Sequence, residues 1–119
     1  MAKRNRIQKR LAIDFDGVLH RYSDGYRDGR PYDQPVVGAV QALTALVAMG
    51  FTYIVFTSRV AEDQWDDAEQ QRTWVAEWLA KYGFPMPEAI TASKWACVAY
   101  IDDRAIRFTN WNDVRKLWG

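Results

Sequence analysis

Short apolar runs that stop at acidic or hydroxyl residues are the feature that most restricts how this 119-residue chain folds. The runs at 11–15 and 98–101 meet aspartates at their ends, and the run at 51–56 ends at Thr57-Ser58-Arg59. Runs this short, rich in β-branched and aromatic residues, favour buried strands over helices. A weaker run at 89–91 predicts a fourth strand.

Segments with helical spacing separate these runs. After a helix start at Asp33-Gln34-Pro35, apolar residues recur from Val36 to Val47, and Gly50 ends the pattern. Acidic residues at 62–67 open a second helix, which carries Trp74, Trp78 and Tyr82 on one face and ends at Gly83. A last helical segment holds Val114, Leu117 and Trp118. Strands alternating with helices predict a three-layer, Rossmann-like α/β fold whose mainly parallel sheet has helices on both faces.

Composition fits one globular domain over residues 1–119, with a basic lead-in at 1–8. Hydrophobic residues make up 49% and charged residues 26% of the chain. The only cysteine, Cys97, excludes an internal disulfide and a Cys-based zinc site, which fits a reducing, cytoplasmic setting. No apolar stretch approaches the roughly 18 residues that cross a bilayer, so we expect no membrane association.

The charge balance gives little sign of a nucleic-acid-binding protein. The net charge is +1, which provides no global basic field. One local cluster remains, formed by Lys3, Arg4, Arg6, Lys9 and Arg10. It is either a solvated lead-in or a nucleic-acid arm, and because it precedes the first strand we expect it at the far end of the sheet from the strand ends.

Parallel strands end at one edge of a sheet, where ligands gather, so the polar strand ends are expected to converge there. Asp14 and Asp102 offer hard oxygen ligands that suit Mg²⁺. The Lys94 ammonium and the Thr57 hydroxyl can hold phosphate oxygens, which leaves Asp14 to attack phosphorus. Asp16, two residues on, can exchange protons with the leaving group and with water. The plainer alternative is a set of acids that cap helices and solvate the sheet edge.

Four motifs in this order resemble those of the haloacid dehalogenase (HAD) superfamily of phosphatases. They are Asp14-Phe15-Asp16-Gly17-Val18, the strand that ends at Thr57, Lys94, and Ile101-Asp102-Asp103, and they span roughly residues 10–108. The resemblance implies that Asp14 is nucleophile and metal ligand, and that Asp16 is the acid/base and binds metal through its backbone carbonyl. It implies phosphate binding by Thr57 and Lys94, with Ser58 and Arg59 adjoining, and metal binding by Asp102 and Asp103. Arg59 is equally interpretable as a structural ion-pair partner.

The intervals after the first two motifs are short, which resembles the members of this superfamily that have no cap domain. An open site of that kind admits the end of a macromolecule, or it is covered by a neighbouring subunit in a homo-oligomer. The run Asp28-Gly29-Arg30-Pro31-Tyr32-Asp33, with Pro35 and Ile101-Asp102-Asp103-Arg104, is similar to the phosphatase domain of phage polynucleotide kinases. The wider pattern, with Gly17-Val18-Leu19-His20 and residues 102–108, resembles small phage and bacterial hydrolases of unassigned substrate.

The expected function is therefore a Mg²⁺-dependent phosphomonoesterase that forms an aspartyl-phosphate on Asp14. Its substrate is a phosphorylated small molecule, a nucleotide or a nucleic-acid end. The alternatives are a polynucleotide 3′-phosphatase or nucleotidase, and a non-catalytic HAD-like binding module. The presence of both Asp14 and Asp16 argues against the binding module.

Other interpretations depend on single features. A receiver-type signalling domain also combines aspartates, Thr, Lys and Mg²⁺, but it carries its phosphorylated aspartate on a middle strand, where this chain has Thr57. His20 is either structural or a substrate contact. Trp65 and Trp95 flank the expected mouth of the site, where they pack or stack on a base.

Overall fold

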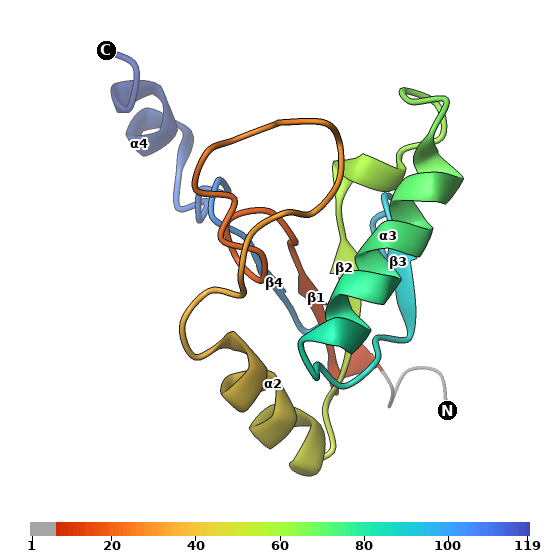
Figure 1. Ribbon diagram of the computed structural model, residues 1–119. Helices are drawn as coiled ribbons and strands as arrows, with labels where there is room; N and C mark the ends of the chain where they lie inside the picture. The colour runs from red at the N-terminus through yellow and green to blue at the C-terminus, as the bar shows by residue number, and fades with distance from the viewer. Residues whose placement is uncertain (1–6) are drawn as a thin grey trace.

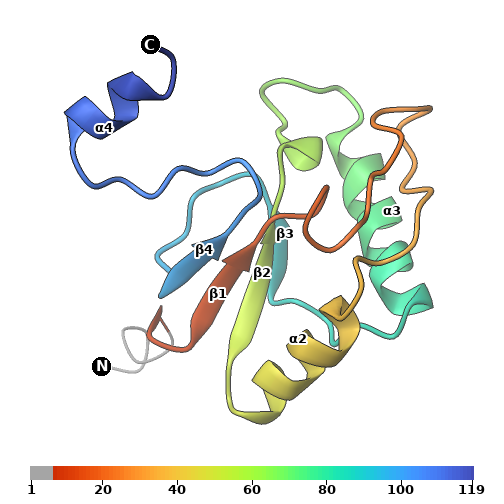
Figure 2. The same cartoon turned by 90° about the vertical axis from the view of Figure 1, so that its left-hand side faces the viewer.

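A computed structural model describes residues 7–119, and its centre is a four-stranded sheet (Figures 1 and 2). The strands are β1 (Arg10–Ile13), β2 (Thr52–Phe56), β3 (Ala89–Thr91) and β4 (Ala99–Ile101), in the order β3-β2-β1-β4. All neighbouring strands are parallel. Ile13 lies opposite both Val55 and Ile101, so the carboxyl ends of the three strands are level. The predicted Rossmann-like α/β fold is confirmed.

The helices are α2 (Ala39–Ala48), the 3₁₀ turn η1 (Ser58–Val60), α3 (Ala68–Lys81) and α4 (Trp111–Lys116). The two long helices begin later than the sequence predicts. The Val36 amide donates to the Leu19 carbonyl and the Arg21 amide to the Gln34 carbonyl, which holds residues 34–36 in extended backbone. The acidic stretch 62–67 instead contains a turn, in which the amides of Gln64 and Trp65 both donate to the Ala61 carbonyl.

Both long helices pack on the same face of the sheet. Strand side chains alternate between faces, so Leu11 and Ile13 of β1 point the same way. With Tyr53 and Val55 of β2 they form a cluster with Leu43 of α2 and with Val75, Trp78 and Leu79 of α3. Burying one such side chain contributes about 1.5–3 kcal/mol. This cluster fixes α2 and α3 against the strands whose carboxyl ends carry the predicted site residues.

The other face of the sheet is covered in part by the connection between β3 and β4. These strands lie at opposite edges, so the chain must cross the sheet to join them. Arg10 shares a face with the buried Ala12, and its guanidinium lies 5.0 Å from the ring centroid of Trp95. Its Nη1 also donates to the carbonyl of Ala96 at 3.3 Å. In the described residues this covering segment is not helical.

The amino ends of the strands carry the described part of the basic cluster. Lys9 lies over the Phe51 ring, and Arg10 pairs with Glu88 at 3.2 Å. These contacts are at the opposite end of β1 from Asp14, as predicted. Lys3, Arg4 and Arg6 lie outside the described residues. Among residues 7–119, none of the helices is long and apolar enough to cross a bilayer.

Candidate active site

Three carboxylates meet where β1 and β4 end. The Asp14 amide donates to the Ile101 carbonyl at 2.9 Å, which ties the two strand ends together. Asp14, Asp102 and Asp103 each place a carboxylate oxygen within 4.8 Å of the others. Burial, the negative charge of Asp102, and the hydrogen bond and charge of Asp103 outweigh a hydrogen bond from the Phe15 amide and raise the pKa of Asp14 to about 7.

This cluster fits a divalent cation. Like charges crowded at a half-buried position repel one another, and either a proton or a cation relieves the repulsion. The donors are carboxylate oxygens, which Mg²⁺ prefers.

Gly17 allows the turn after β1 to lie against this cluster. Its φ is +85°, in the left-handed region that favours glycine. A Cβ at this position would lie 2.3 Å from Oδ2 of Asp103. The Phe15 carbonyl accepts from the amides of Leu19 and His20, both at 2.9 Å, which closes the turn. Residue 17 therefore has neither the room nor the backbone conformation for a larger side chain.

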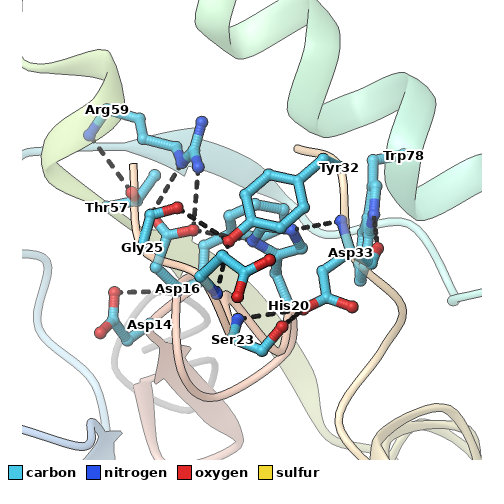
Figure 3. Close-up of polar contacts among 12 residues, drawn as sticks. Asp14, Asp16, His20, Ser23, Gly25, Tyr32, Asp33, Thr57, Arg59 and Trp78 are labelled. Carbon is cyan, nitrogen blue, oxygen red and sulfur yellow. Dashed lines mark hydrogen bonds and ion pairs between the residues drawn. The ribbon is translucent and has the colours of Figure 1, made fainter. Parts of the chain in front are cut away.

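Asp16 does not belong to the acidic cluster and is held by the side chains of Arg59 and His20 (Figure 3). Arg59 donates from Nε to Oδ2 at 2.7 Å and from Nη2 to Oδ1 at 3.0 Å. His20 Nδ1 lies 2.9 Å from Oδ1. Burial raises the pKa of Asp16, but the hydrogen bonds and charges of His20 and Arg59 lower it further than burial raises it. Asp16 is therefore an ionised, oriented carboxylate in this arrangement.

His20 positions Asp16 from inside the core. Its side chain is fully buried and stacks on Phe15, with 5.2 Å between ring centroids. The Asp33 amide donates to Nε2 at 2.9 Å, so the proton of a neutral ring is on Nδ1 and is donated to Asp16. Of the two interpretations of His20 in the sequence, the structure places it in the structural one.

The three residues after β2, Thr57, Ser58 and Arg59, make different contacts. Thr57 is buried, and its Oγ1 accepts from the Arg59 amide at 3.2 Å, capping η1. Ser58 is exposed at the edge of the sheet. Arg59 makes the ion pair with Asp16, and its Nη1 donates to the Gly29 carbonyl at 2.8 Å and to Gln71 Oε1 at 3.0 Å. The sequence did not decide between phosphate binding and an ion pair for Arg59, because its partner Asp16 lies 43 positions away in the chain.

Lys94 lies beside strand β4. Its ammonium lies 5.6 Å from the ring centroid of Tyr100, and it does not line the cavity at Asp14. The expectation that Trp95 flanks the mouth is wrong, because the crossing of the sheet carries Trp95 back to Arg10 at the amino end of β1. Arg104 lines the Asp14 cavity instead, and its amide donates to Oδ1 of Asp102 at 2.7 Å.

Two adjoining cavities occupy this edge of the molecule. The first, the acidic cavity, has a volume of about 370 Å³ and is lined by Asp14, Phe56, Ser58, Ala61, Asp63, Gln64, Ala92, Asp102 and Arg104. The second, the aromatic cavity, has a volume of about 460 Å³ and is lined by Asp16, Tyr22, Tyr26, Ser58, Arg59, Trp65, Asp67 and Gln71. Ser58 lines both.

Sequence reasoning missed most of the aromatic cavity. Gln71 carried a usable signal, because it is a polar residue one turn before Val75 on the buried stripe of α3. Tyr22 carried no such signal. Its backbone has a φ of 55°, which is uncommon for a residue other than glycine and which the neighbouring residues do not predict.

Comparison with known proteins supports the fold. No protein-family model and no curated protein matches the chain. The crystal structure of an MCSG target from Vibrio cholerae is similar, with a TM-score of 0.57 and 24% sequence identity over 92% of this chain and 96% of that one. At this identity the likeness shows a shared fold alone.

Proposed function

We propose that this protein is a Mg²⁺-dependent phosphomonoesterase whose nucleophile is Asp14. The observation that carries the proposal is the meeting of Asp14, Asp102 and Asp103 within 4.8 Å at the carboxyl edge of a parallel sheet, beside an open cavity. The order of the four sequence motifs, which resembles that of HAD phosphatases, supports the same assignment.

Asp14, Asp102 and Asp103 would hold the cation. When bound, Mg²⁺ supplies positive charge that offsets the repulsion between these carboxylates and an incoming phosphate. The remaining phosphate oxygens need donors from the chain. Ser58 and Arg104 line the cavity and carry such donors, and Thr57 and Lys94 remain the candidates that the motif resemblance implies.

The reaction has two halves. In the first, a carboxylate oxygen of Asp14 bonds to phosphorus while the bond to the leaving oxygen breaks. In the second, water attacks the same phosphorus, its proton passes to Asp16, and Asp14 is released with inorganic phosphate. The lowered pKa of Asp16 keeps its carboxylate ionised, which is the form that can accept this proton, although it also makes the carboxylate a weaker base. Service as acid in the first half requires a proton on Asp16 and therefore a looser contact with Arg59.

Hydrolysis of an aryl phosphate by the purified protein tests the proposal. We expect turnover that requires Mg²⁺ and that falls by about 10³-fold or more in Asp14→Asn, because an amide cannot attack phosphorus. Asp66→Asn, a matched change at an exposed acid outside both cavities, should retain wild-type turnover. Metal-independent turnover, or full activity in Asp14→Asn, would contradict the assignment. Absence of turnover with tight oligonucleotide binding would favour the non-catalytic module.

A further inference from the structure

We infer that the aromatic cavity holds the leaving group and takes a nucleobase, so that the substrate is a nucleoside monophosphate unit. The inference rests on the proposed function and names its substrate class. It starts from the relation between the two cavities, which share Ser58. Asp14 lines the acidic cavity and Asp16 the aromatic one. A phosphate attacked by Asp14 therefore directs its leaving oxygen toward Asp16, with the rest of the leaving group in the aromatic cavity.

The walls of this cavity are aromatic and accessible. Tyr22, Tyr26 and Trp65 line it, and the side chains of Tyr26 and Trp65 are 73% and 53% exposed. None of the three belongs to the hydrophobic core. Aromatic side chains left open beside a reactive site are suited to stack on flat rings, and every nucleobase offers such a face. A volume of about 460 Å³ lies in the range of small-molecule sites.

The floor of the cavity is polar and already fixed. Gln71 is 5% exposed, and its Nε2 donates to the Gly29 carbonyl at 2.9 Å and to Asp67 Oδ2 at 3.3 Å. Its Oε1 accepts from Arg59, whose guanidinium carbon lies 5.7 Å from the ring centroid of Tyr22. A floor held by hydrogen bonds costs little to organise on binding. The Asp67 carboxylate adds an acceptor for the amino group of a base.

The inference separates two substrates that differ only in the base. Adenosine 5′-monophosphate and ribose 5-phosphate share a phosphate and a sugar, but only the first can stack. We expect kcat/KM for the nucleotide to exceed that for the sugar phosphate by about tenfold or more. A 3′-phosphorylated oligonucleotide in the same assay shows whether the favoured unit is free or at a chain end; either source supports the cavity.

Trp65→Ala removes one wall and should lower the nucleotide-to-sugar ratio by about tenfold. Tyr26→Ala should lower it in the same direction. The matched control is Trp118→Ala, which removes an indole that is 76% exposed and lines neither cavity, and which should leave the ratio unchanged. Equal kcat/KM for both substrates, or an unchanged ratio in both cavity variants, would overturn the inference while leaving the phosphatase assignment in place.

A binding measurement keeps the two claims apart if nothing is hydrolysed. Adenosine has no phosphate, so its calorimetric titration into wild-type protein reports the aromatic cavity alone. Saturable binding that weakens in Trp65→Ala but not in Trp118→Ala supports the inference even where the phosphatase assignment fails. If adenosine does not bind and the nucleotide is not preferred over the sugar phosphate, the aromatic cavity does not bind a nucleobase and the inference is wrong.

Discussion

At the scale of single residues, the environment divides two neighbouring aspartates into different roles. Asp14 is half-buried and is crowded by Asp102 and Asp103, and its pKa rises to about 7. Asp16 is paired with Arg59 and His20, and its pKa falls. Pairs of acids whose surroundings push their pKa values apart are typical of catalytic sites. The sequence places both acids at a strand end, but only the fold reveals which of them is neutralised by partners.

The crowding of Asp14 predicts a pH-dependent stability of the cation-free protein. A carboxyl group whose folded pKa lies above its unfolded value retains its proton longer in the folded state, so the free energy of unfolding falls as pH rises from 3.8 to about 7. In chelator at about pH 8, Asp14→Asn should therefore be more stable than wild type by about 1–2 kcal/mol, a value reduced for partial exposure.

Urea unfolding followed by circular dichroism measures this difference. Well below pH 3.8 the Asp14 carboxyl carries its proton in both the folded and the unfolded state, and the two proteins should have nearly the same free energy of unfolding. A variant less stable than wild type at about pH 8, or a gain of equal size at both pH values, would show that the charge of the half-buried, crowded Asp14 does not destabilise the folded protein.

At the scale of elements, the turn between β1 and its following loop carries the strictest steric requirement. Gly17→Ala places a methyl group against Asp103 in addition to the strain of a left-handed backbone, which costs about 1–2 kcal/mol by itself. We expect a loss of more than about 2 kcal/mol in the free energy of unfolding, with reduced turnover, because Asp103 must move.

Gly25→Ala is the matched control for this turn. Gly25 has a φ of +68°, and a Cβ there would meet no atom within 4 Å. It should show the backbone strain but keep its activity. If both alanine variants lose the same stability and retain the same turnover, the contact between residue 17 and Asp103 has no part in the site.

Elements differ in how far the sequence predicts them. The strands were predictable because each is a short apolar run between polar ends, and β3 has the predicted bounds. The start of α2 was not, because Gln34 and Val36 form backbone hydrogen bonds with Arg21 and Leu19 that the residues around Pro35 do not reveal. Trp95 was misplaced for a similar reason: the residues around it do not show the course of the β3–β4 connection, which brings its ring to Arg10 at the amino end of β1.

At the scale of the whole molecule, the fold brings strand ends from residues 14, 57 and 102 to one edge and leaves that edge open. Both long helices support the sheet from one face, and the β3–β4 connection crosses the other. The described residues form one sheet with its helices and contain no separate cap domain (Figure 2). Under the proposed function, substrate recognition falls to the loop that bears Tyr22 and Tyr26 and to the segment that bears Trp65.

The most direct test of the central claim is to locate the phosphoryl group on the protein during turnover. In Asp16→Asn the base is missing, so the second half of the reaction should slow and the covalent intermediate should accumulate. After acid quenching of a reaction with a ³²P-labelled phosphomonoester and Mg²⁺, the label should be on the peptide that contains Asp14. The double variant that combines Asp16→Asn with Asp14→Asn should carry no label. Turnover with no label on the protein, or label on a different peptide, would contradict nucleophilic attack by Asp14.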